Sequence, residues 1–117
     1  MQKMCVIGAG SWGSALALSL HKNNHQVFMW TRDVEQVEEI RDTKENSKFL
    51  PGVIFPDDLI VSNDLEEVIK DSEIVVLAVP SQAVRSVSKQ IKPFIKENQI
   101  LVDVAKGLEK GTGLRLS

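Results

Sequence analysis

The sequence carries a glycine-rich stretch whose spacing suits phosphate chemistry. Residues Gly8-Ala9-Gly10-Ser11-Trp12-Gly13 match the pattern G-x-G-x-x-G. In this pattern the first glycine allows a tight turn, the second lets the backbone approach a diphosphate, and the third brings a helix close to a strand. The N–H groups at the helix N-terminus then bind the diphosphate. The pattern alone also fits a glycine-rich turn without a ligand, so its meaning depends on the flanking elements.

A second stretch, Trp30-Thr31-Arg32-Asp33, follows at the place where dinucleotide-binding domains choose their cofactor, about 20 residues past the glycines. A carboxylate there accepts from the ribose 2′-hydroxyl of NAD, whereas an arginine suits the 2′-phosphate of NADP or stacks on adenine. Asp33 would either take the hydroxyl or cap the following helix. We favour NADPH as the cofactor, and these residues also allow NADH.

Lys106 is a candidate substrate-binding residue, because it follows an apolar run and precedes Gly107. An ammonium at that position could hydrogen-bond a carbonyl oxygen and stabilise the alkoxide that hydride transfer creates. A solvated surface lysine is the plainer alternative.

Apolar runs alternate along the chain with segments of helical periodicity. The run 74–79 shows no polar alternation, which is typical of a central parallel strand buried on both faces. Asn46 to Asp57, with Pro51, Gly52 and Pro56, is predicted to be a loop. We expect strands at 3–7, 26–30, 59–61, 73–79 and 100–105, and helices at 12–23, 34–44 and 81–90. A further helix, capped by Asn63 or Asp64, is expected to run through Lys70.

This succession predicts an α/β fold, a doubly wound (Rossmann) parallel sheet with helices on both faces. The expected spatial order of the strands is 3-2-1-4-5, and ligands bind beyond the carboxyl ends of such strands. We expect residues 1–117 to form one dinucleotide-binding domain that is incomplete at its C-terminal end.

The composition disfavours several classes of function. The chain has 117 residues, 43% of them hydrophobic, and a net charge of -2, which disfavours a nucleic-acid partner. No apolar run is long enough to span a membrane, and a cytoplasmic location is expected.

The single cysteine, Cys5, is expected to be a buried apolar side chain. His21 and His25 have no partners at ligand spacing, so no metal site is expected.

Taken together, these motifs resemble those of the bacterial NAD(P)-dependent glycerol-3-phosphate dehydrogenase family. Beyond the two stretches described, the resemblance rests on Asn46 with Phe49-Leu50-Pro51-Gly52, on Ala78-Val79-Pro80-Ser81 with Arg85, and on Ala105-Lys106-Gly107-Leu108-Glu109 with Gly111-Thr112-Gly113. The glycine turn is generic. The other stretches, in this order along the whole chain, are specific.

The resemblance implies reversible hydride transfer between NAD(P)H and dihydroxyacetone phosphate, giving sn-glycerol 3-phosphate for phospholipid synthesis. It implies that Lys106 lies between nicotinamide and this small-molecule substrate. It also implies that the general acid/base lysine belongs to a helical substrate domain absent from these residues, so no catalytic residue is assigned here. The cofactor-binding residues expected from motif and resemblance are Gly8, Gly10, Ser11, Trp12, Gly13, Arg32, Asp33, Phe49 and Lys106.

Two other functions remain open at this stage. One is a different dehydrogenase on the same fold, which would not be expected to combine Leu50-Pro51-Gly52 with Lys106-Gly107-Leu108-Glu109. The other is a non-catalytic dinucleotide-binding module. The sequence leaves the oligomeric state open, a homo-oligomer included.

Overall fold

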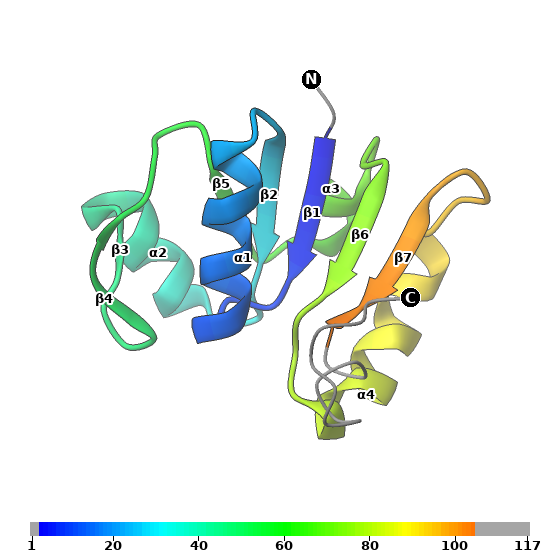
Figure 1. Ribbon diagram of the computed structural model, residues 1–117. Helices are drawn as coiled ribbons and strands as arrows, with labels where there is room; N and C mark the ends of the chain where they lie inside the picture. Colours follow the sequence, from blue (N-terminus) through cyan, green and yellow to red (C-terminus); the bar gives the residue numbers. More distant parts are fainter. Residues whose placement is uncertain (1–2, 105–117) are drawn as a thin grey trace.

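The computed structural model describes residues 3–104, and its centre is a five-stranded parallel sheet (Figure 1). The strands lie in the order β5-β2-β1-β6-β7. Counted along the chain, this is the predicted order 3-2-1-4-5, so the doubly wound parallel fold is confirmed. The strands are β1 Lys3–Ile7, β2 Gln26–Trp30, β5 Ile60–Ser62, β6 Ile74–Leu77 and β7 Ile100–Asp103.

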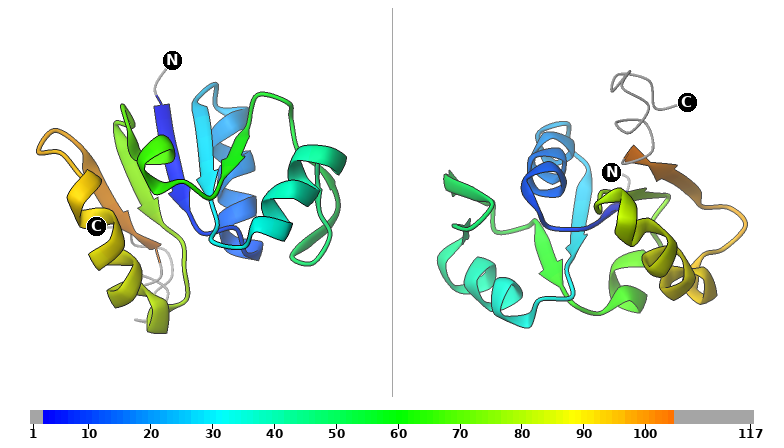
Figure 2. Two further views of the ribbon diagram at one scale, coloured as in Figure 1. Left: turned by 180° about the vertical axis from the view of Figure 1, so that it is seen from behind. Right: turned by 90° about the horizontal axis from the view of Figure 1, so that it is seen from below.

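Helices cover both faces of this sheet (Figure 2). One face is covered by α1, with α2 packed into the same core at the β5 edge, and the other face is covered by α3 and α4. The helices are α1 Ser11–Lys22, α2 Val34–Thr43, α3 Leu65–Ile69 and α4 Ser81–Ile91, followed by the 3-10 helix η1 Lys92–Phe94. The helices and strands match the predicted ranges to within a residue or two at most ends, which is the usual uncertainty of a boundary.

The side chains of β1 show why both faces need a cover. Val6 packs with Ala17 of α1, whereas Cys5 and Ile7 pack on the opposite face with α3 and α4. Successive side chains of a strand point to opposite faces, so an uninterrupted apolar strand must be buried on both. The expectation that Cys5 is buried is confirmed.

Asp33 and Asp64 start α2 and α3 in the same way. An oxygen of Asp33 accepts from the N–H groups of Glu35 and Gln36 at 3.0 and 3.3 Å. Asp64 accepts from the N–H groups of Glu66 and Glu67. These contacts satisfy amides that have no partner within the helix. The helix-capping interpretation of Asp33 is therefore confirmed.

The prediction of a loop over Asn46 to Asp57 was wrong. The segment forms a small antiparallel ribbon of β3 Glu45–Asn46 and β4 Leu50–Ile54, beside α2 (Figure 1). Pro51 is tolerated because a two-stranded ribbon leaves outward positions that need no ladder donor. Burial of the Phe55 side chain anchors the end of the ribbon in the core, and the backbone N–H of Phe55 donates to the Lys44 carbonyl oxygen at 2.7 Å.

Candidate functional site

The ligand-binding edge of the sheet holds a cavity of about 350 Å³. It lies where β1 stands between β2 and β6, at the point from which the sheet is wound in both directions. The turns after β1, β2 and β6 line it, together with the β3–β4 ribbon and α4. Its lining residues are Gly8, Ala9, Gly10, Trp30, Thr31, Arg32, Asp33, Gln36, Lys48, Phe49, Ala78, Val79, Pro80, Ala83 and Val87.

The glycine turn packs tightly on its inner side and is open on its outer side. Gly8 has a φ of +125°, and a Cβ there would lie 2.6 Å from the Ala78 carbonyl oxygen. A Cβ at Gly13 would overlap the Gly8 carbonyl oxygen. At Gly10, by contrast, a Cβ would meet no protein atom within 4 Å. Gly8 and Gly13 are thus required by the fold, whereas Gly10 leaves free space beside the cavity.

The N-terminus of α1 is left open at this cavity. Gly10 occupies the capping position, and no side chain hydrogen-bonds the first turn. This contrasts with α2 and α3, where Asp33 and Asp64 fill the equivalent place. The first turn of α1 contains no acidic residue, so its N–H groups and partial positive charge suit an anionic group. The free space and the uncapped helix together fit a diphosphate.

Ser11 and Trp12 lie in the first turn of α1. The Ser11 hydroxyl donates to the Phe49 carbonyl oxygen at 2.8 Å and so ties the helix to the β3–β4 ribbon. The Trp12 side chain is 55% exposed. It therefore remains on the surface instead of filling the core, and it does not line the cavity.

The cavity wall after β2 brings charged and aromatic groups together. Arg32 and Asp33 are exposed there, as are Lys48 and Phe49 from the ribbon. The Lys48 ammonium lies 5.3 Å from the centre of the Phe49 ring. Lys48 adds a second cation to the one predicted from Arg32. Lys48 could not be predicted at the cavity, because the ribbon that carries it was expected to be an irregular loop.

Trp30 closes the inner wall of the cavity. Its side chain is buried, and its Nε1 has no hydrogen-bond partner among residues 3–104. Gln36 is a further wall residue that sequence reasoning missed; its position three residues after the capping Asp33 was the available signal. Lys106 was predicted to contact nicotinamide and substrate, and it lies outside the described residues.

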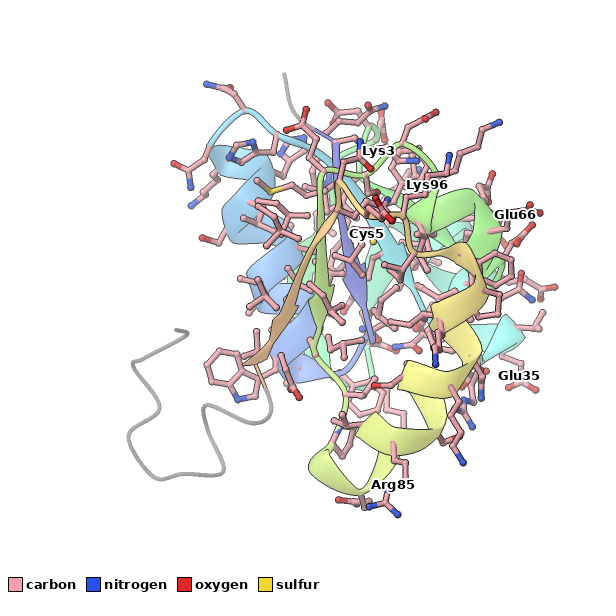
Figure 3. All side chains as sticks on the ribbon, turned by 90° about the vertical axis from the view of Figure 1, so that its right-hand side faces the viewer. Lys3, Cys5, Glu35, Glu66, Arg85 and Lys96 are labelled. Atoms are coloured by element: carbon pink, nitrogen blue, oxygen red, sulfur yellow. The ribbon has the colours of Figure 1, made fainter. Side chains whose placement is uncertain are left out.

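The remaining charged groups are spread over the surface. Arg85 projects from the first half of α4 at the same end of the molecule as the cavity, while Lys3 and Lys96 lie at the opposite end (Figure 3). Within the described part of the chain, no three His, Cys, Asp or Glu side chains gather to hold a metal ion. Across residues 3–104, no helix combines the length and the apolar character needed to cross a membrane.

Comparison with known proteins agrees with this geometry. The family model described as "NAD-dependent glycerol-3-phosphate dehydrogenase N-terminus" matches residues 3–117. The glycerol-3-phosphate dehydrogenase [NAD(P)+] of Fusobacterium nucleatum is 49% identical over 112 residues, which are 96% of this chain and 33% of that protein. The enzyme of the same name from Syntrophomonas wolfei is 41% identical over 100% of this chain and 34% of its own length.

A solved structure shares the fold as well. The crystal structure of glycerol-3-phosphate dehydrogenase from Coxiella burnetii superimposes with a TM-score of 0.81 at 31% identity, covering 86% of this chain and 31% of that one. This chain thus spans about a third of the length of the relatives it matches. The chain belongs to the family of the amino-terminal, NAD-binding part of glycerol-3-phosphate dehydrogenases.

Proposed function

We propose that these residues bind NADPH, with NADH as the weaker ligand, as the cofactor-binding part of an oxidoreductase. The proposed reaction interconverts dihydroxyacetone phosphate and sn-glycerol 3-phosphate in the cytoplasm, and its product serves glycerophospholipid synthesis. The observation that carries the proposal is the uncapped N-terminus of α1 beside the free space at Gly10. Family membership supports the choice of reaction.

The chain's own residues would bind and orient the dinucleotide. The first-turn amides at Ser11 and Trp12 would hold the diphosphate through backbone N–H groups, a role that leaves the Ser11 hydroxyl on Phe49. The exposed side of the Phe49 ring would face the adenine. The bound nicotinamide would supply the hydride chemistry, and Lys106 would hydrogen-bond the substrate oxygen.

The preference for NADPH follows from the charges around the cavity. Arg32 and Lys48 bring positive charge to the wall after β2, where the ribose of the adenosine half would lie. Asp33 brings one negative charge, but one of its oxygens is already held by two helix amides. A 2′-phosphate is therefore favoured over a 2′-hydroxyl at this wall.

In this proposal residues 1–117 bind the cofactor and a separate substrate domain supplies the catalytic groups. These 117 residues are then necessary but not sufficient for turnover. A positioned general acid contributes about 10²- to 10⁴-fold to a rate, and grip on the substrate phosphate orients the reacting carbonyl. By the family resemblance, both come from a substrate domain outside residues 1–117. We therefore expect the 117-residue chain to bind NADPH and to oxidise it negligibly with dihydroxyacetone phosphate.

A chimaera tests the function directly. The 117-residue chain would be joined to the part of the Fusobacterium nucleatum relative that follows the matched residues, and NADPH oxidation would be measured with dihydroxyacetone phosphate. Activity in the chimaera and none in the 117-residue chain is the expected result. Turnover by the 117-residue chain alone would contradict the proposal that the catalytic groups lie outside these residues. A chimaera that binds NADPH but reduces only a different substrate would contradict the assigned reaction.

A further inference from the structure

The Ala9 carbonyl oxygen, in the middle of the glycine turn, is held by two side-chain amides. Gln36 Nε2 donates to it at 2.7 Å and Asn46 Nδ2 donates to it at 2.8 Å. A carbonyl oxygen has two lone pairs, which these two short contacts occupy, and the Ser14 hydroxyl adds a longer contact to the same oxygen at 3.3 Å. The donors come from α2 and β3, far from the turn in sequence.

The two amides also hold each other. Gln36 Nε2 lies 3.2 Å from Asn46 Oδ1, and the Thr31 hydroxyl donates to Gln36 Oε1 at 2.8 Å. Asn46 Nδ2 also donates to the Ser14 hydroxyl of α1 at 2.9 Å. Asn46 is 0% exposed, so water does not compete for its contacts. We call Gln36 and Asn46, with their bonds to Ala9, the amide clasp.

The clasp fixes the direction of one peptide group. The Ala9–Gly10 peptide is planar and trans, so its N–H points opposite to its C=O. With the Ala9 oxygen held toward α2 and β3, the Gly10 N–H must point away from the clasp. Rotation of this peptide would break both amide contacts at once.

We propose that the amide clasp positions the glycine turn for diphosphate binding, by aiming the Gly10 N–H at the ligand before the ligand arrives. This inference rests on the proposed dinucleotide binding and assigns Gln36 and Asn46 as positioning residues for it. A donor that is already oriented costs no reorganisation when the anion binds.

Gln36→Met tests the clasp, because it keeps side-chain length and removes the three side-chain hydrogen bonds of this half-buried residue, with Thr31, Ala9 and Asn46. Gln99→Met is the matched control. Gln99 is also half-buried, and its Nε2 donates to the carbonyl oxygens of Ile69 and Ser72 at 2.9 and 2.8 Å, away from the cavity lining. Both variants lose comparable hydrogen bonds, so both should be destabilised to a similar extent in urea.

The measurement compares two ligands on folded protein. NADPH contains the diphosphate, whereas adenosine 2′-monophosphate contains the Arg32-facing phosphate and no diphosphate. We expect Gln36→Met to bind NADPH about tenfold more weakly than the wild type and adenosine 2′-monophosphate equally well. We expect Gln99→Met to bind both ligands like the wild type.

The contrary outcomes separate the two hypotheses. Wild-type affinity for NADPH in Gln36→Met would overturn the clasp and leave the proposed function intact. An equal loss for both ligands would also overturn it, because it would mean a general disturbance of the cavity. Absence of NADPH binding in the wild type would overturn the proposed function, and the clasp with it.

Discussion

The Gly8 carbonyl oxygen faces the backbone of Gly13 so closely that a Cβ on Gly13 would overlap it. This contact joins the end of β1 to the first turn of α1 and leaves no room for any side chain at Gly13. Gly10, between them, has an extended backbone with φ -76° and open space around it. Gly13 is therefore needed for the packing of the helix on the strand, whereas Gly10 leaves open space. Mutations can separate these two roles.

Gly13→Ala should destabilise the fold. Alanine gains roughly 1 kcal/mol of helix propensity, but overlap with a backbone oxygen costs more, and we expect a net loss of about 2 kcal/mol. Urea denaturation followed by circular dichroism measures this loss. Gly10→Ala is the control and should change stability little. Equal stability of Gly13→Ala and the wild type would mean that the helix does not approach the strand as described.

Gly10→Val should remove dinucleotide binding and leave the chain folded. A branched side chain suits the extended backbone at Gly10, where a Cβ meets no protein atom within 4 Å, and it would fill the space proposed for the diphosphate. The NADPH fluorescence change on binding should disappear while the circular dichroism spectrum is unchanged. Normal NADPH binding by this variant would place the ligand elsewhere.

Arg32→Ala should abolish the preference for NADPH. A charge-assisted contact to the 2′-phosphate contributes on the order of 1.5 to 3 kcal/mol, so NADPH affinity should fall about 10- to 100-fold while NADH affinity is retained. Calorimetric titration of both cofactors measures the two affinities. Arg85→Ala removes an exposed arginine at the same end of the molecule and should change neither. Equal wild-type affinities for the two cofactors would refute the assignment.

Cys5 should make stability depend on pH in the alkaline range. Burial raises the pKa of the Cys5 thiol to about 11, although a contact with Ser72 opposes this. Because the folded state favours the neutral thiol, its stabilising effect is complete below the ordinary thiol pKa. The effect is lost as pH rises toward 11. The full loss is about 2 to 3 kcal/mol, from about 1.4 kcal/mol for each pKa unit.

The measurement is the free energy of unfolding from pH 8 to pH 11, with Cys5→Ala as the control. Burial also lowers the pKa of the Lys3 ammonium, and a Coulombic interaction with Cys5 opposes that shift. The difference between the two proteins therefore reports the thiol together with its interaction with Lys3. Parallel pH profiles for the two proteins would show that the pKa of Cys5 is not raised by folding.

The sheet could be predicted from the sequence because the residues that indicate each strand and helix lie within that element or next to it. Each apolar run is long enough to identify a buried strand, and Asp33 and Asp64 mark helix starts within a few residues of their partners. The strand order then follows from the handedness of parallel crossovers. The glycine turn and Arg32 were predicted at the cavity for the same reason, and the structure places them together there.

The β3–β4 ribbon could not be predicted, because it is stabilised by contacts between residues that are far apart in the sequence. Asn46 is 37 positions from Ala9, and nothing near Asn46 in the sequence indicates that its amide will meet the glycine turn. Pro51 and Gly52 normally interrupt regular structure, and the burial of Phe55 and of Asn46 offsets that tendency. Lys48 was missed at the cavity because its position depends on this ribbon.

The most direct test of dinucleotide binding at the glycine turn is a titration of the isotopically labelled chain with NADPH, followed by amide NMR signals. The largest shifts should occur at Gly10, Ser11 and Arg32, and Gly10→Val should show none of them. Glu66 and Lys70, beside a separate cavity away from the glycine turn, serve as the internal control and should not move. Unchanged turn signals at saturating NADPH, or shifts concentrated at Glu66 and Lys70, would contradict the proposed site.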